Sequence, residues 1–251
     1  MLLAIDTATR TASVALFDQT GVIGEATWRA HENHTTSLMP QIVQLMRASG
    51  VQMSNVRAVG VATGPGSFTG LRIGLSAAKG LAFGMGLPLV GIPTLDALAH
   101  AFSHVQSFMR RTLPIWAIVQ AGRGRYSAAR YFVRHSRAAR EGDYLVGDAE
   151  YLAGQIAASS EDLAASKNSR GSSHTVRRAW VCGEVDENLK STLLVRLNER
   201  VLIASPSANV RRAAYLAELA WARYQTNNVD SVETLAPYYI PTTSLPQTES
   251  K

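Results

Sequence analysis

The sequence has almost none of the residues that build covalent or metal-held scaffolds. It contains one cysteine, Cys182, among 251 residues, which excludes an internal disulfide and a cysteine-based metal cage. Cys182 lies in Arg178–Glu184, a segment typical of a buried strand, and no distinctive base stands near it in the sequence to activate the thiol. We therefore expect Cys182 to be a small core residue.

Long apolar runs and a leader pattern are also missing. No run approaches the length of about 20 residues that a membrane-spanning helix needs. The N-terminus begins directly with a strand pattern and lacks the basic, apolar and small-residue segments of a signal peptide. We expect a soluble, cytoplasmic protein that does not bind membranes.

Acidic residues are absent from one long stretch of a basic chain. The apolar fraction is 46%, which indicates a globular protein, and the net charge is +6. Eight arginines and no acidic residue lie between Arg110 and Arg140. Such a stretch can contact nucleic acid or an acidic partner. It can equally be a solvated surface, since no aromatic-rich platform accompanies the charges.

The order of strand and helix patterns predicts an α/β protein of two lobes, residues 1–102 and 103–251. The first lobe opens with three hairpin-linked strands, and its later strands need helical crossovers, so its sheet is mixed with helices on its faces. Helix 208–225 is predicted to pack back on the first lobe. The first lobe is predicted to have strands at 2–5, 11–17, 22–28, 56–62 and 89–92, and helices at 34–49, 69–85 and 94–102. The second lobe is predicted to have strands at 113–119, 126–133 and 179–182, helices at 149–158 and 187–197, and an exposed insertion at 159–175.

A glycine-rich segment, Gly64–Gly74, is the most specific motif, and it lies between a strand and a helix. Glycines expose backbone N–H groups at a helix start, which makes a potential anion site. No Gly-Lys-Ser/Thr closes the segment, and the spacing of Gly64, Gly66 and Gly70 misses the dinucleotide fingerprint by one residue. Gly64 and Gly66 remain candidates for a vestigial nucleotide pocket.

The turn Asp6-Thr-Ala-Thr9 follows the first strand and offers a carboxylate with two hydroxyls, those of Thr7 and Thr9. These groups can hold a metal–phosphate group. They can equally form a local Asx-type turn that satisfies nearby N–H groups, which is the commoner use of such residues. Asp6, Thr7 and Thr9 therefore join the candidate nucleotide pocket.

The helix after the glycine-rich segment carries two rows of small residues. One row is Gly70, Gly74 and Ala77, and a second runs at four-residue steps through Ser76–Gly84. Each interior glycine costs about 0.5–1 kcal/mol relative to alanine, so close approach of a neighbour must offset it. The chain's own sheet explains one row, and a partner helix would explain the second.

Two histidine pairs invite a metal interpretation, His31 with His34 and His100 with His104. Neither pair has a third ligand fixed by spacing. We predict that neither is a metal site.

Taken together, these motifs resemble the TsaB family of tRNA threonylcarbamoyladenosine biosynthesis proteins. The resemblance rests on Asp6–Thr9, His34 leading into Ser37–Pro40, Gly64–Arg72, Gly91–Leu95 and Pro237–Ile240. It implies an α/β, actin-like and ribonuclease-H-like, two-lobed ATPase-type fold with a mixed five-stranded sheet in the N-terminal lobe. It also implies a non-catalytic scaffold or activator that binds the catalytic TsaD subunit, with a TsaE-like ATPase as third member. That assembly transfers a threonylcarbamoyl group to the tRNA adenosine next to the anticodon, so tRNA is met indirectly.

Departures from the TsaD pattern support the non-catalytic role. Thr94 and Leu98 stand where TsaD carries its metal-binding histidines, and neither can replace an imidazole ligand. Gln120–Arg123 stands where family members usually carry Asp-Ala-Arg, so a carboxylate is lost. The resemblance thus implies no catalytic residue, metal or cofactor, with ATP or ADP at a partner interface as the remaining alternative.

In the family, docking on TsaD or on a second copy uses the first two helices of the N-terminal lobe, which here are 34–49 and 69–85. The implied interface residues are His34, Leu38, Ile42, Gly70, Leu71, Gly74 and Leu75. Two other functions stay open. One is an ATP-dependent kinase or hydrolase acting alone through Asp6, Mg²⁺ and the Gly64 loop; the other is direct tRNA binding by Arg110–Arg140.

Overall fold

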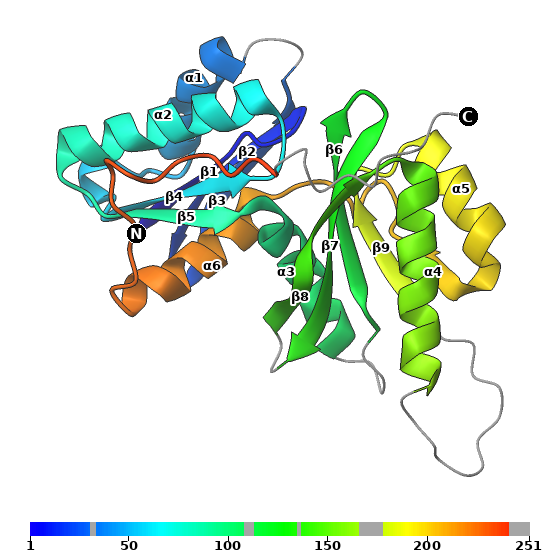
Figure 1. The fold of residues 1–251 in the computed structure, drawn as a ribbon. Helices are drawn as coiled ribbons and strands as arrows, with labels where there is room; N and C mark the ends of the chain where they lie inside the picture. Colours follow the sequence, from blue (N-terminus) through cyan, green and yellow to red (C-terminus); the bar gives the residue numbers. More distant parts are fainter. Residues whose placement is uncertain (31–33, 108–112, 135–136, 166–177, 241–251) are drawn as a thin grey trace. The chain divides into compact units, whose positions relative to one another are not determined.

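The chain folds into two α/β units in the computed structural model, which describes residues 1–30, 34–107, 113–134, 137–165 and 178–240 (Figure 1). The first unit combines Met1–Ala97 with Val210–Tyr239. The main segment of the second unit is Leu98–Asn209. The sequence patterns predict a boundary after residue 102, whereas the first unit of the structure ends at Ala97 before its return at Val210. Residues 210–225 of the helix predicted at 208–225 belong to the first unit.

A mixed sheet with the strand order β3-β2-β1-β4-β5 forms the centre of the first unit. β1 runs antiparallel to β2 and parallel to β4, β2 pairs antiparallel with β3, and β4 pairs parallel with β5. The five strands are β1 (Leu2–Asp6), β2 (Thr11–Asp18), β3 (Gly21–Arg29), β4 (Ala58–Gly64) and β5 (Leu89–Pro93). This confirms the mixed five-stranded sheet predicted for the N-terminal lobe.

Helices cover both faces of this sheet (Figure 1). α1 (His34–Ala48) and α2 (Phe68–Met85) pack on one face, and α6 (Ala213–Gln225) packs on the other. Strand β1 shows why both faces are covered, because its side chains alternate and all of them are buried. Leu3 and Ile5 join the core under α1 and α2, whereas Leu2 and Ala4 join the core under α6.

The second unit contains a sheet with the order β10-β9-β6-β7-β8. β6 pairs antiparallel with β7 and parallel with β9, and β7 pairs antiparallel with β8. The strands are β6 (Ile115–Gly122), β7 (Arg125–Arg134), β8 (Arg137–Gly147), β9 (Ala179–Gly183) and β10 (Val201–Ile203). Numbered in chain order within each unit, both sheets have the order third, second, first, fourth, fifth. The duplication is one of topology, and it leaves no short repeat in the sequence.

The core of the second unit lies under α4 (Ala149–Ala165) and α5 (Glu187–Leu197). α3 (Thr94–Ser107), which begins in the first unit, packs on the opposite face, where the rings of Phe102 and Trp180 lie 5.8 Å apart. Cys182 is buried in β9, which confirms its expected place in the core.

Two strands of this unit, β8 and β10, were not predicted from the sequence. β8 carries Arg140–Asp143 on a largely exposed edge, with Gly142 at a φ of 76°, so it lacks the apolar alternation that predicts a strand. β10 is only three residues long. The predicted insertion at 159–175 is also wrong at its start, because α4 continues to Ala165; residues 166–177 lie outside the described part of the chain.

None of the helices in the described residues combines the length and apolarity that crossing a bilayer requires.

Candidate functional site

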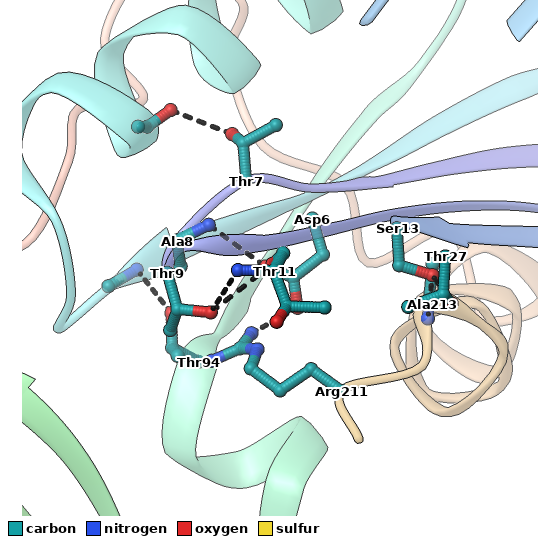
Figure 2. A network of polar contacts seen from close by, with 12 residues as sticks. Asp6, Thr7, Ala8, Thr9, Thr11, Ser13, Thr27, Thr94, Arg211 and Ala213 are labelled. Atoms are coloured by element: carbon teal, nitrogen blue, oxygen red, sulfur yellow. Dashed lines mark hydrogen bonds and ion pairs between the residues drawn. The ribbon is translucent and has the colours of Figure 1, made fainter. Parts of the chain in front are cut away.

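The carboxylate of Asp6 is the charged centre of the predicted nucleotide pocket, and it is 2% exposed at the end of β1. Its Oδ1 accepts a hydrogen bond from the backbone N–H of Ala8 at 3.0 Å, which closes an Asx-type turn (Figure 2). Its Oδ2 accepts from the guanidinium of Arg211. Both carboxylate oxygens are therefore engaged inside the first unit.

The two threonine hydroxyls of the turn also bond within the chain. The Oγ1 of Thr7 donates to the carbonyl of Gly70 at 2.7 Å, and thereby ties the turn to α2. The Oγ1 of Thr9 donates to the carbonyl of Thr11 and accepts from its N–H, at 3.2 and 3.3 Å. Thr7 and Thr9 are 2% and 3% exposed. They serve the turn rather than an open ligand site.

The loop from Gly64 to Ser67 packs against the same turn. Gly64, at a φ of 115°, donates its N–H to the Oγ1 of Thr94 at 3.1 Å, and Ser67 donates its N–H to the carbonyl of Ala8 at 2.7 Å. A side-chain carbon on Gly66 would meet the Ala8 carbonyl oxygen at 2.3 Å. Two of the amides expected to bind an anion are thus used by the chain itself.

The C-terminal segment around Tyr238 closes the Gly64 end of the loop. The N–H of Tyr238 donates to the carbonyl of Thr63 at 2.7 Å, and a carbon on Gly64 would meet the Tyr238 carbonyl oxygen at 2.4 Å. This contact gives Tyr238, which lies in one of the motifs behind the family resemblance, a structural role in the first unit.

Sequence reasoning missed Arg211 as a member of this site. It precedes α6, it is 5% exposed, and its partner Asp6 is 205 residues away in the chain. The only signal in the sequence is a pair of arginines, Arg211 and Arg212, in front of an alanine-rich helix. That signal names no partner, because the pairing is created by α6 packing on β1 and β2.

A metal–nucleotide group, which an ATPase-type fold implies, does not fit these residues. Asp6 would have to ligate the metal, but its oxygens accept from Ala8 and Arg211. Within the described part of the chain, no three His, Cys, Asp or Glu side chains are grouped so as to hold a metal ion. Of the two residues that the resemblance places at TsaD's histidine positions, Thr94 is buried and bonded to Gly64, and Leu98 is a buried core residue.

The interface anchors that the resemblance implies on α1 and α2 are buried within the chain. The side chains of Leu38, Ile42, Leu71 and Leu75 are 1%, 0%, 1% and 5% exposed, because they form the chain's own core. They cannot be presented to a partner. The side chain of His34, where α1 begins, lies outside the described residues.

Gly70 and Gly74 were also predicted to admit a partner, and instead they admit the chain's own β1–β2 turn. A side-chain carbon on Gly70 would meet the Thr7 carbonyl oxygen at 2.1 Å, and one on Gly74 would meet the Thr7 Oγ1 at 2.2 Å. The first row of small residues is therefore explained by packing inside the unit. The second row differs, because carbons on Gly80 and Gly84 would meet nothing within 4 Å.

The outer surface of α1 and α2 is apolar and poor in charge. Three residues carry charge in the two helices, Arg47, Arg72 and Lys79. The large exposed apolar side chains are Met39 and Val43 of α1 and Phe68, Phe83 and Met85 of α2, and Phe83 is 78% exposed. Depletion of charge around exposed apolar and aromatic groups is the composition found at the centres of protein interfaces.

In the second unit, some arginines of the predicted basic stretch are already engaged. Arg130 pairs with Glu141 at 2.5 Å, and the guanidinium of Arg140 lies 4.2 Å from the ring centre of Tyr144. Arg110 and Arg111 lie outside the described residues. The remaining described arginines lie in β7, in β8 and in the exposed β6–β7 turn.

Gln120, in the segment where the resemblance implies a lost aspartate, belongs to a polar cluster in the second unit. Gln120 donates its N–H to Glu184 at 2.8 Å and its side-chain amide to Asp186 at 3.2 Å. The hydroxyl of Tyr126 donates to Asp186 at 2.6 Å. Burial and this bond raise the pKa of Tyr126 to about 12. Burial also raises the pKa of the Cys182 thiol, which keeps it protonated and unreactive.

The duplicated strand order, with helices on both faces of each mixed sheet, defines an actin-like, ribonuclease-H-like α/β fold. The same architecture is found in YeaZ from Pseudomonas aeruginosa, which has a TM-score of 0.71 over 95% of this chain and 99% of that chain. The sequence identity is 22%, so this likeness shows the fold alone.

Residues 8–242 match the family model of TsaD, tRNA N6-adenosine threonylcarbamoyltransferase, and the chain belongs to this family. It is 40% identical over 98 residues to the tRNA threonylcarbamoyladenosine biosynthesis protein TsaB of Escherichia coli K12, and 43% identical over 103 residues to TsaB of Haemophilus influenzae. These segments cover 39% and 40% of this chain and 42% of each relative. The resemblance to TsaB inferred from the motifs is confirmed.

Proposed function

We propose that the protein is an accessory subunit in tRNA threonylcarbamoyladenosine biosynthesis and docks on a TsaD-like catalytic subunit. Its membership of the TsaD family and its similarity to TsaB proteins support the pathway. The observation that carries the docking role is the charge-poor, apolar outer surface of α1 and α2. A TsaE-like ATPase is the proposed third member, and tRNA is met through the assembly.

The proposal gives this chain no catalytic residue of its own. Thr94 and Leu98 supply no imidazole at the positions of TsaD's histidines. The engaged oxygens of Asp6 count against the alternative of an ATP-dependent kinase or hydrolase acting alone. ATP turnover by the isolated chain that is lost in Asp6→Ala would favour that alternative.

The docking surface is assigned to the exposed residues of the two helices, in place of the buried anchors inferred from the sequence. Arginine at Gly74 would be an unsuitable probe, because it would strike Thr7 and disturb the fold. Phe83 and Val43 are better probes, since they are 78% and 42% exposed and contribute little to the core.

The test is co-purification of the chain with the TsaD paralogue of the same organism, followed by a threonylcarbamoyl transfer assay with and without the chain. Phe83→Glu and Val43→Glu should each weaken the association by about tenfold or more, because a carboxylate would be buried at the contact. Val195→Glu on α5, where Val195 is 88% exposed, is the matched control and should bind normally.

Normal association of Phe83→Glu and Val43→Glu with TsaD would remove the assigned surface. If the wild-type chain neither binds TsaD nor stimulates transfer, the accessory role itself is wrong. Self-association that both glutamate variants abolish, in the absence of TsaD binding, would identify a second copy of this chain as the occupant.

A further inference from the structure

Arg211 is a buried charge that the proposed function does not use. Its guanidinium is 5% exposed, and one nitrogen, Nη2, donates to Asp6. Nε and Nη1 are buried as well and have no hydrogen-bond partner among the described residues. Burying a guanidinium with only one hydrogen-bonded nitrogen destabilises the folded state unless a nearby opposite charge compensates it. Asp6, also buried, supplies that compensation.

The start of α6 fixes where this guanidinium lies. Directly after Arg211, Arg212 pairs with Glu25 of β3 at 2.6 Å, and the N–H of Ala214 donates to the same carboxylate at 2.9 Å. The N–H of Ala213 donates to the Oγ of Ser13 in β2 at 2.9 Å (Figure 2). Because these bonds anchor the helix start to the sheet, Arg211 is held against the end of β1.

The position beside Asp6 is the one that an ATPase-type fold would give to a metal ion, since Asp6 ends the first strand next to a glycine-rich loop. Asp6, the β1–β2 turn and the Gly64 loop form one corner of the first unit. We propose that the guanidinium of Arg211 is the cation built into this corner and takes the place of a divalent metal ion beside Asp6. A side chain of the same unit thus compensates the charge of the carboxylate, and the corner stays closed without a ligand. This inference does not depend on the proposed docking function.

The energetics of a buried ion pair make the proposal testable. Removing one partner leaves an uncompensated buried charge, which is strongly destabilising, whereas removing both charges together is often close to neutral. A carboxylate left alone at this corner should also regain affinity for a divalent cation. Arg211→Met keeps the apolar stem of the side chain and removes only the charged fork, so it is the informative single change.

The experiment is thermal unfolding of the full chain as wild type, Arg211→Met, Asp6→Asn and the double variant, each with and without Mn²⁺. We expect each single variant to unfold about 6–15 °C below wild type and the double variant to recover at least half of that loss. Mn²⁺ at about 10 mM should raise the unfolding temperature of Arg211→Met by about 3–5 °C. It should leave the wild type and the double variant unchanged.

Three results would overturn the proposal. One is a Mn²⁺-dependent stabilisation of the wild type that Asp6→Asn abolishes, since Asp6 would then be open to metal. Another is an Arg211→Met variant that folds but gains no stability from Mn²⁺. The third applies even if Arg211→Met fails to fold. A double variant that is equally unfolded would mean that Arg211 supports the fold by its packing and not by its charge.

Discussion

The two units share one strand order, but they differ in the contacts made where the fourth strand ends and the next helix begins. We call this place the corner of each unit. In each unit the fourth strand ends at a glycine with a positive φ, Gly64 at 115° and Gly183 at 109°. A helix N-cap follows three residues later in both, Ser67 in the first unit and Asp186 in the second. The chain path is thus shared, although the sequences of the two corners are unlike.

The two units differ in the groups that pack against the start of the helix, α2 in the first unit and α5 in the second. In the first unit, glycines of α2 let the β1–β2 turn approach at contact distance, and the side-chain oxygens of Asp6, Thr7 and Thr9 are bonded within the unit. In the second unit, the side chains of Gln120 and Tyr126 reach the exposed Asp186, and the β6–β7 turn lies open to solvent. The first corner should therefore be sensitive to added volume as well as to loss of the Asp6 carboxylate, and the second to loss of the Asp186 carboxylate or to pH.

The largest effect is expected from adding volume at the first corner. Gly70→Ala would place a carbon against the backbone carbonyl of Thr7, which no side-chain rotation can relieve. We expect a loss of about 3 kcal/mol in the free energy of unfolding, measured by urea denaturation. Unfolding at the wild-type urea midpoint would show that the close packing of α2 on the turn is wrong.

Removing the carboxylate at the second corner should have a smaller effect. Asp186→Ala deletes the N-cap of α5, whose carboxylate accepts from the N–H of Leu189, and leaves the hydroxyl of buried Tyr126 without this acceptor. The expected loss is about 2 kcal/mol in the same measurement. Asp186→Asn, which can still cap and accept, is the control and should retain most of the stability. Equal losses in the two variants would contradict the role given to these bonds.

The pKa of Tyr126 offers a pH test of the second corner. In the folded protein this pKa is raised from 10 to about 12, because burial and the bond to Asp186 favour the neutral phenol. Since the folded value lies above the unfolded one, the stability linked to this group is fully present below pH 10 and is lost as the pH rises through 12. The late-ionising part of the phenolate absorbance should decrease by one tyrosine in Tyr126→Phe. A spectrum unchanged by that substitution would refute the assignment.

The smallest effect is expected on the outer face of α2, and its sign is opposite to that at Gly70. A carbon on Gly80 meets nothing within 4 Å, so Gly80→Ala should stabilise the chain by about 0.5–1 kcal/mol through helix propensity alone. Urea denaturation beside Gly70→Ala makes a matched pair in one helix. Destabilisation by Gly80→Ala would mean that this face is covered within the chain.

Local sequence patterns were sufficient where the chain is regular and apolar. The five strands of the first unit and both of its first helices were predicted to within a few residues, because period-two and period-3.6 patterns are strong there. The exposed edge strand β8 and the short β10 gave no such pattern. The implied interface anchors show a related limit of local patterns. An apolar residue at helical spacing, such as Leu38 or Leu75, marks the buried face, and the sequence does not say whether the chain or a partner buries it.

The sequence by itself determined the fold class, the family and the position of the glycine-rich turn, because these follow from residue types at short spacing. Only the tertiary structure decided that Asp6 faces Arg211, that Thr7 fills the space left by Gly70 and Gly74, and that Phe83 remains exposed. Each of these depends on segments that are far apart in the chain and meet only when the helices pack on the sheet. Charge compensation and close packing arise from contacts between distant segments, so no local sequence pattern predicts them.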